Sequence, residues 1–344
     1  MPTIRVFGMT GVAICLLLAA AEAAVGGPSA SATKIGIDDH YPNSIEVARA
    51  VGVRYLREGI AIESGNRAQI ARIQAEAAAG FRLNIQFTNT RGIEDKGAKP
   101  GPVTDDKVFK DALAAELDAT HPELITIQNE EDGLQFWNGT PEEYLHELGD
   151  AVEVAHAKGY RISNGGLTWT GVKLAYWRHL WISGQHQAAD RFAREALGPE
   201  KPGQQIIGDI PDSADPSRPI LGQNALLRAK LARVEFFISA YPKTGIDYLN
   251  FHWFQTGAEN FREVATWLGQ TTGLPVICNA MGQFDDSSER VTSLLSTAVA
   301  LHMPYVFWFA QQGHGGGAAI GLTDENGALR PSGIAFKAFV AAHQ

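Results

Sequence analysis

The stretch KIGIDDHYP, Lys34 to Pro42, distinguishes between two α/β folds. KIGID is a short apolar strand, and the residues after it are acidic, aromatic and proline. An open doubly wound sheet normally has a glycine-rich turn after its first strand, because the backbone there must approach a pyrophosphate. The segment from Asp38 to Pro42 cannot form such a turn. The beginning of the folded chain therefore favours a parallel barrel.

The rest of the chain alternates short apolar strands with longer amphipathic helices. Seven further strands are expected, at Val53–Glu58, Phe81–Phe87, Leu124–Gln128, Arg161–Asn164, Asp247–Phe254, Leu274–Asn279 and Pro304–Phe309. Thr140 and Glu143 have the spacing of a capping box, which predicts a helix start. Residues 198–222 are rich in proline, glycine and aspartate and are interpreted as a surface excursion. Eight strand–helix units predict fold class α/β, a single-domain (β/α)8 TIM barrel over residues 34–344.

The first residues have the pattern of a targeting segment. Arg5 supplies positive charge, Val12 to Ala21 is an apolar run, and Ala21 to Ala23 is a small-x-small cleavage pattern. The run is too short to span a membrane comfortably. We therefore expect a signal peptide over residues 1–23, a linker over 24–33, and a secreted or periplasmic protein without stable membrane insertion. An uncleaved anchor is the alternative interpretation.

Composition excludes some partners. The chain of 344 residues is 45% hydrophobic and 19% charged, which is typical of a globular protein. Its formal charge of −9 is spread along the sequence, whereas nucleic-acid binding needs clustered lysine and arginine. A neutral or weakly charged ligand fits better. Of the two cysteines only Cys278 lies beyond the signal segment, so no disulfide within the chain is expected. We assume a monomer.

Side chains at the carboxyl ends of barrel strands form the active site in this fold. The expected ends are rich in carboxylates, amides and tryptophans, among them Asp38, Arg57, Asn129, Glu130, Trp169, His252, Trp253, Asn279 and Trp308. Each residue alone is explained by capping a strand or packing a rim. Together they suit a carbohydrate substrate, because hydroxyls need neutral donors and acceptors and sugar faces stack on indole. A phosphate site would instead need arginine, lysine and backbone nests.

Strand four carries the most specific motif, because apolar ITI is followed by Gln128, Asn129 and Glu130. Here the chain resembles clan A retaining glycoside hydrolases, whose fourth strand ends in Asn-Glu. The resemblance implies that Glu130 is the general acid/base and that Asn129 hydrogen-bonds the sugar 2-hydroxyl. Glu131 and Asp132 are expected to point elsewhere, because neighbours on a strand face opposite sides.

The resemblance extends from Lys34 to the end of the chain. It implies that Arg57 neighbours the nucleophile, that His252 lies at the end of strand six, and that Trp308 stacks under the sugar. Asp38, Trp169, Trp253 and Asn279 are expected further substrate contacts. The implied activity is that of a secreted O-glycosyl hydrolase acting on a β-linked poly- or oligosaccharide.

Strand seven departs from the family pattern, which is apolar-Pro-Val-Ile-x-x-Glu-x-Gly. The chain has LPVICNAMG, Leu274 to Gly282, with Ala280 where the nucleophilic glutamate is expected. Retaining hydrolysis needs two carboxyl groups about 5 Å apart, one of which attacks the anomeric carbon. A methyl group cannot attack, so ordinary retaining turnover should be largely lost.

Four explanations of Ala280 stay open. The residue was changed to trap a substrate; the protein is a natural, non-catalytic carbohydrate-binding pseudoenzyme; an acid such as Glu58, Asp285 or Asp286 substitutes; or water attacks directly with inversion.

A serine hydrolase is a poorer alternative, since no Gly-x-Ser-x-Gly elbow occurs. No HExxH pair occurs either, and Asp38, Asp39 and His40 fit a structural rim better than a metal site. We therefore expect neither a metal nor a cofactor.

Overall fold

The computed structural model describes residues 32–38, 43–62, 67–89, 101–102, 105–133, 135–197, 225–310 and 321–343. From Ala32 onwards the chain clusters as one compact unit. The expected signal peptide, most of the linker, Asp39, His40 and the 198–222 excursion lie outside the described residues. In the ranges that are described, no helix is long and apolar enough to cross a membrane.

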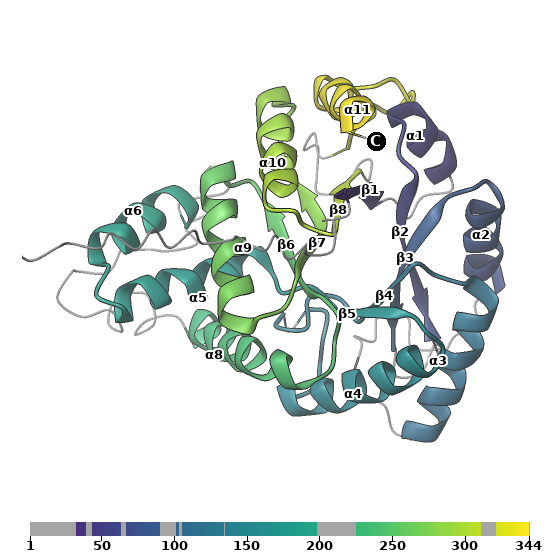
Figure 1. Cartoon of the computed structure of the whole chain (residues 1–344), viewed down its shortest axis with the longest axis horizontal. Helices are drawn as coiled ribbons and strands as arrows, with labels where there is room; N and C mark the ends of the chain where they lie inside the picture. The colour runs from purple at the N-terminus through teal and green to yellow at the C-terminus, as the bar shows by residue number, and fades with distance from the viewer. Residues whose placement is uncertain are drawn as a thin grey trace, which may run out of the picture. The chain divides into compact units, whose positions relative to one another are not determined.

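Eight strands lie around a common axis with helices outside them (Figure 1). The strands are β1 (Lys34–Asp38), β2 (Tyr55–Ala61), β3 (Arg82–Thr88), β4 (Leu124–Ile127), β5 (Arg161–Asn164), β6 (Leu249–Phe254), β7 (Val276–Gly282) and β8 (Tyr305–Phe309). The helices are α1 (Ser44–Val51), α2 (Arg67–Ala78), α3 (Asp106–Thr120), α4 (Pro141–Ala157), α5 (Trp169–Ile182), α6 (His186–Ala196), α8 (Ala225–Ala240), α9 (Ala258–Thr272), α10 (Ser288–Ala300) and α11 (Pro331–His343). A short 3-10 helix, η2 (Tyr241–Lys243), follows α8.

All neighbouring strands are parallel, in the order β5-β4-β3-β2-β1-β8-β7-β6. Between β5 and β6 the barrel closes by two isolated parallel bridges, Ser163 with Tyr248 and Leu167 with Phe251. Asn164 reinforces this seam, because its side chain accepts from Asn250 N at 2.6 Å and donates to Asn250 O at 2.9 Å. The predicted (β/α)8 barrel is therefore confirmed.

The barrel interior changes from aromatic to polar towards the carboxyl ends of the strands. Near the other end, buried Leu124, Ile277, Tyr305 and Phe307 pack together, and Lys34 donates to Glu123 at 2.6 Å below them. Above this apolar layer the inward positions carry amides and hydroxyls, then an arginine, a histidine and carboxylates. Because side chains alternate along each strand, the residues between these positions face the helices. Interior polarity thus marks the carboxyl end as the place for chemistry.

The expected strands all form; β1 and β5 have the expected bounds, and the ends of the other strands shift. β2 reaches Ala61 instead of Glu58, because its pairing with β3 continues to Thr88. β7 reaches Gly282 instead of Asn279, and its register shifts between Ile277 and Ala280 against β6 and between Cys278 and Met281 against β8. The predicted capping box is confirmed at the start of α4, where the Thr140 side chain and the Glu143 side chain bond each other's backbone N–H.

Candidate active site

The turn after β4 sends successive side chains in different directions. Gln128 has φ 65° and Glu130 has φ 45°, so two non-glycine residues adopt left-handed backbone conformations. Each such residue costs about 1–2 kcal/mol and persists where its surroundings hold it. Gln128 is held from outside the barrel, because its amide donates to Glu147 of α4. Asn129 and Glu130 are thereby turned towards the barrel mouth.

Glu130 lies at one end of a line of hydrogen bonds across the mouth. Its Oε1 is 2.9 Å from Nδ1 of His252, and Nε2 of His252 is 3.1 Å from Oδ1 of Asn279. Gly166 makes room for the ring: it has φ 102°, and a Cβ there would lie 2.3 Å from His252 Nε2. The site thus joins the ends of β4, β6 and β7 through one imidazole.

Arg57 is the second organising group. Its guanidinium forms an ion pair with Asp38 and donates to the side chains of Gln86 and Asn129, the latter at 3.0 Å. It also reaches the carbonyl oxygen of Asn279 at 3.4 Å. Since Arg57 and Asp38 are both buried, each charge needs the other. This hub connects β1, β2, β3 and β7 with the residue that precedes Glu130.

Ala280 faces the same interior as Glu130. Met281 is paired with Trp253 on β6 and Trp308 on β8, whose rings pack towards the helices, whereas Ala280 is paired with His252. Partners across parallel strands share a face, so Ala280 points inwards beside His252. Asn279 also points inwards, as its hydrogen bonds show. The register shift in β7 therefore turns two consecutive residues to the interior, which a regular strand cannot do.

The acids considered as substitutes lie elsewhere. Glu58 faces the helix layer and pairs with Arg72 of α2 at 2.6 Å. Asp285 pairs with Arg290 at 2.6 Å, and Asp286 pairs with Arg330 at 3.0 Å. Asp38, by contrast, ends β1 on the interior side, opposite the Arg57 guanidinium. Among these acids only Asp38 shares the barrel mouth with Glu130.

The structure separates the three expected tryptophans. Trp253 is fully buried between β6 and α9, with its ring 5.6 Å from Phe261. Trp308 packs on Phe336 of α11 at 6.1 Å. Both occupy outward positions because their inward neighbours are His252 and Phe307. Trp169 alone joins the mouth, where its half-buried ring lies 5.0 Å from that of Phe254.

An aromatic rim accompanies Trp169. We use this name for Trp169, Phe254, Phe284 and Phe309, whose rings lie within 5.9 Å of Phe254. The three phenylalanines were missed in the sequence. The signal was present for two of them, since Phe254 is two residues beyond His252 and Phe309 is two beyond Phe307, both on inward positions. The rim offers apolar ring faces next to the hydrogen-bonding groups.

The residues after Glu130 anchor the site from behind. Glu131 is fully buried; it accepts from Asn164 at 2.7 Å and from the Tyr241 hydroxyl. Burial raises the pKa of Glu131 to about 8. Asp132 accepts from the backbone N–H and hydroxyl of Thr168 at 2.8 and 2.6 Å. Because Thr168 is the N-cap of α5, Asp132 fixes the helix start that carries Trp169.

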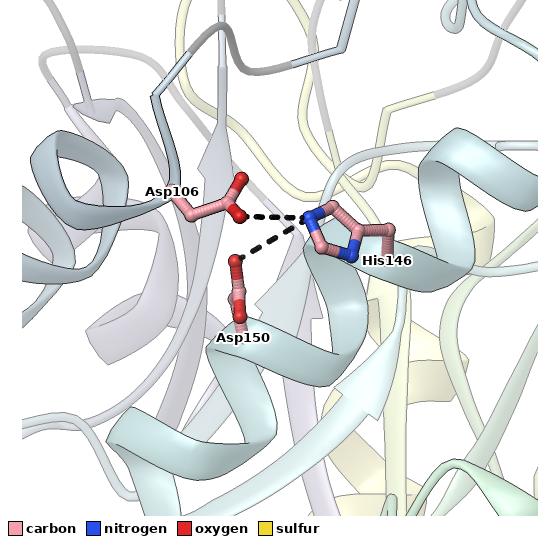
Figure 2. Close-up of side chains that lie close together, drawn as sticks. All are labelled: Asp106, His146 and Asp150. Carbon is pink, nitrogen blue, oxygen red and sulfur yellow. Dashed lines mark ion pairs between the residues drawn. The ribbon is translucent and has the colours of Figure 1, made fainter.

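Outside the barrel mouth, the side chains of Asp106, His146 and Asp150 form a cluster of possible metal ligands on the outer surface of α3 and α4 (Figure 2). Nε2 of His146 is 3.0 Å from Asp106 and 4.0 Å from Asp150, and all three side chains offer ligand atoms within 4.8 Å of one another. The i, i+4 spacing of His146 and Asp150 was the available sequence signal. Lys110 donates to Asp150 at 2.9 Å, so an ammonium already balances part of the acidic charge.

Comparisons with known proteins identify the fold. No family model matches the chain, and no curated protein sequence matches it. Solved structures do match: a xylanase 10B from Thermotoga petrophila in complex with xylobiose, with a TM-score of 0.52, 11% identity, and 90% of this chain and 94% of that chain covered. A GH128 exo-β-1,3-glucanase from Aureobasidium namibiae follows, with a TM-score of 0.51, 11% identity, and 89% and 96% coverage.

A GH53 catalytic domain from Ignisphaera aggregans is similar to the same degree, with a TM-score of 0.51, 13% identity, and 92% and 98% coverage. The three proteins are glycoside hydrolases built on TIM barrels. At such low identity the likeness shows the fold: this chain is a (β/α)8 barrel whose polar interior opens at the carboxyl ends of the strands.

Proposed function

We propose that this chain is a glycoside hydrolase by descent that binds a β-linked poly- or oligosaccharide at the barrel mouth. In this proposal Glu130 is the general acid/base, Asn129 contacts the sugar 2-hydroxyl, and Ala280 occupies the nucleophile position without its carboxylate. One observation carries it: Ala280 faces inwards beside His252, which itself contacts Glu130. The fold neighbours, the amide-lined mouth and the aromatic rim support a carbohydrate ligand.

The chemistry follows from the missing group. A retaining reaction forms a bond between the anomeric carbon and a carboxylate, and only then does water release the sugar. Glu130 can still protonate a leaving oxygen, but a methyl group at Ala280 cannot form the intermediate. The chain as written should therefore bind its glycan and show little or no turnover, as a substituted or degenerate hydrolase.

Restoring the carboxylate tests the proposal. Three variants are compared with the parent chain: Ala280→Glu, Ala280→Gln as a control of equal size without a charge, and Ala280→Glu combined with Glu130→Gln. Reducing-end release is measured on β-1,3-glucan, β-1,4-glucan and β-1,4-xylan. We expect Ala280→Glu to raise kcat by on the order of 10³-fold or more, because removing the nucleophile of a hydrolase can cost on the order of 10⁶. Adding Glu130→Gln should lower it by about 10²–10⁴-fold.

The second candidate is a pseudoenzyme that only binds glycans. The intact aromatic rim and Arg57 hub beside a missing nucleophile favour it. It predicts oligosaccharide binding in all variants and turnover in none. A third outcome, activity of the parent chain that Ala280→Gln leaves unchanged, would overturn the nucleophile assignment. Asp38→Asn would then test Asp38 as the base of an inverting reaction.

We also propose that the protein is exported after removal of residues 1–23 and acts as a monomer. The apolar run before Ala21 and the small residues around the expected cleavage position support export. Expression with the native N-terminus should yield a secreted or periplasmic chain that begins at Ala24, which intact-mass measurement detects. A mass that retains the first residues would favour the uncleaved anchor. Light scattering on the purified chain tests the monomer.

A further inference from the structure

Two backbone carbonyl oxygens determine which side-chain atoms donate and which accept in the polar layer inside the barrel. Asn84 Nδ2 lies 3.1 Å from the carbonyl oxygen of Leu124, which can only accept, so Asn84 must turn its amide NH2 that way. The hydroxyl of Ser163 faces the carbonyl oxygen of Ile125 at 3.4 Å in the same manner. Ser163 therefore accepts from Thr126, which lies 3.0 Å away. These carbonyls leave the Asn84 Oδ1 as an acceptor pointing across the barrel.

Asn279 of β7 continues this chain of donors and acceptors from Asn84 of β3. Its Nδ2 is 3.1 Å from Oδ1 of Asn84 and 3.2 Å from the hydroxyl of Thr126. The opposite amide orientation would place two oxygens against each other, so this orientation is the one that the network satisfies. Oδ1 of Asn279 is then the atom that faces Nε2 of His252 at 3.1 Å. An amide oxygen only accepts, so His252 must carry a proton on Nε2.

This tautomer determines what lies between His252 and Glu130. With Nε2 protonated, a neutral His252 presents a lone pair at Nδ1, and Oε1 of Glu130 lies 2.9 Å from that atom. A carboxylate facing a lone pair would be repelled, so the contact requires one proton, on the carboxyl group or on Nδ1. His252 is buried and Glu130 nearly so, which strengthens this requirement.

We propose that Asn279 and Asn84 are positioning residues that hold His252 in the Nε2–H tautomer and thereby make His252 and Glu130 a pair that stores one proton. Asn279 then acts through His252 instead of contacting sugar. The use of the stored proton, delivery to a leaving oxygen, rests on the proposed function. The tautomer itself does not, because it follows from the interior of the barrel.

The surrounding charges leave this assignment intact. Glu130 comes from the β4 end and Arg57 from β2, with its guanidinium 3.4 Å from the Asn279 carbonyl oxygen. Asp38 from β1 is paired with Arg57, so these two charges largely cancel. The β5–α5 connection presents Gly166 and β7 presents Ala280, neither of which is charged. The proton between His252 and Glu130 is thus governed by the pair and by Asn279.

Side-chain nitrogen NMR tests the tautomer directly. Long-range ¹H–¹⁵N spectra of ¹⁵N-labelled protein separate Nε2–H from Nδ1–H imidazoles, and His252→Gln assigns the signals by their loss. At about pH 7 the parent chain should show a proton on Nε2 of His252. A neutral Nδ1–H tautomer at about pH 7 would overturn the proposal without any variant.

Three variants separate positioning from mere packing. Asn279→Leu removes the acceptor, so His252 should change to Nδ1–H and donate to ionised Glu130. Asn279→Asp keeps an acceptor towards His252, with its second oxygen protonated towards Asn84 Oδ1, and should keep Nε2–H. Ser163→Ala removes the contact with Thr126 but leaves Asn84 bonded to the Leu124 carbonyl oxygen, so it should also keep Nε2–H. An unchanged tautomer in Asn279→Leu contradicts the proposal; if that variant does not fold, the parent chain and Asn279→Asp still decide. The expected spectra without turnover in Ala280→Glu would uphold the tautomer and refute the hydrolase by descent in favour of the glycan-binding pseudoenzyme.

Discussion

The two faces of the same strand ends differ more than their sequences suggest. Glu130, His252 and Ala280 face the interior at the barrel mouth. His252 is within hydrogen-bonding distance of Glu130 and lies beside Ala280. Their immediate neighbours Glu131, Trp253 and Met281 face the helices, and all three are fully buried. One step along the chain therefore separates groups that can meet a ligand from groups that hold the barrel together. Variants on the two faces test that separation.

The largest expected effect is on stability, from an outward residue. Trp253→Ala removes an indole that packs on Phe251 and Phe261 and lies 5.2 Å below the ammonium of Lys173. Such a truncation should lower the free energy of unfolding by about 3–5 kcal/mol. Urea denaturation measures the loss. The affinity of the folded variant for a β-linked oligosaccharide should not change. A loss of affinity in the folded variant would show that Trp253 contacts the ligand.

The next effect is a pH dependence that also comes from the outward face. Burial raises the pKa of Glu131 to about 8, so the folded state keeps a proton that the unfolded chain releases near its ordinary pKa of 4.5. The contribution of protonated Glu131 to the free energy of unfolding is therefore fully present below about pH 4.5 and is lost as the pH rises towards about 8. This contribution is on the order of a few kcal/mol.

Glu131→Gln should flatten this dependence, which unfolding curves at about pH 5, 7 and 9 measure. A matched control at Glu76 is needed, because burial and the nearby Glu58 raise the pKa of Glu76 to about 8 as well, so that this carboxyl contributes to the same pH dependence. We expect Glu76→Gln to flatten part of the slope and the double variant to flatten most of it. An unchanged slope in Glu131→Gln would show that this carboxyl is ionised in the folded protein.

The smallest expected effect is on binding, from the aromatic rim. Trp169→Ala should weaken the affinity for a β-1,3- or β-1,4-linked oligosaccharide about five- to tenfold, because one stacking contact contributes about 1 kcal/mol. Calorimetric titration of the parent chain and the variant measures the difference. Trp308→Phe, on the outward face, is the control and should leave affinity unchanged. Equal effects of both variants would remove the distinction between the rim and the helix layer.

Most of the fold could be predicted from local patterns. Eight apolar runs alternate with helices, some of which begin at a capping residue such as Thr140 or end at a glycine such as Gly52, and each of these signals depends only on residues a few positions apart. The expected ends of β2 and β7 were too early because strand ends depend on pairing partners, which a single run does not reveal. Glu130, Asn129, Arg57 and His252 were placed at one mouth by the same logic, and the structure brings them together around two hubs.

Other features needed the tertiary structure. The sequence by itself determined the order of eight strand–helix units, the acidic end of strand four, and the alanine at the end of strand seven. Only the tertiary structure decided that Asn279 and Ala280 both face inwards, that Trp253 and Trp308 face the helices, and that Phe284 joins the rim. The physical reason is that strand alternation is a local rule, whereas a shifted register and the two left-handed residues after β4 arise from contacts with neighbouring strands and helices.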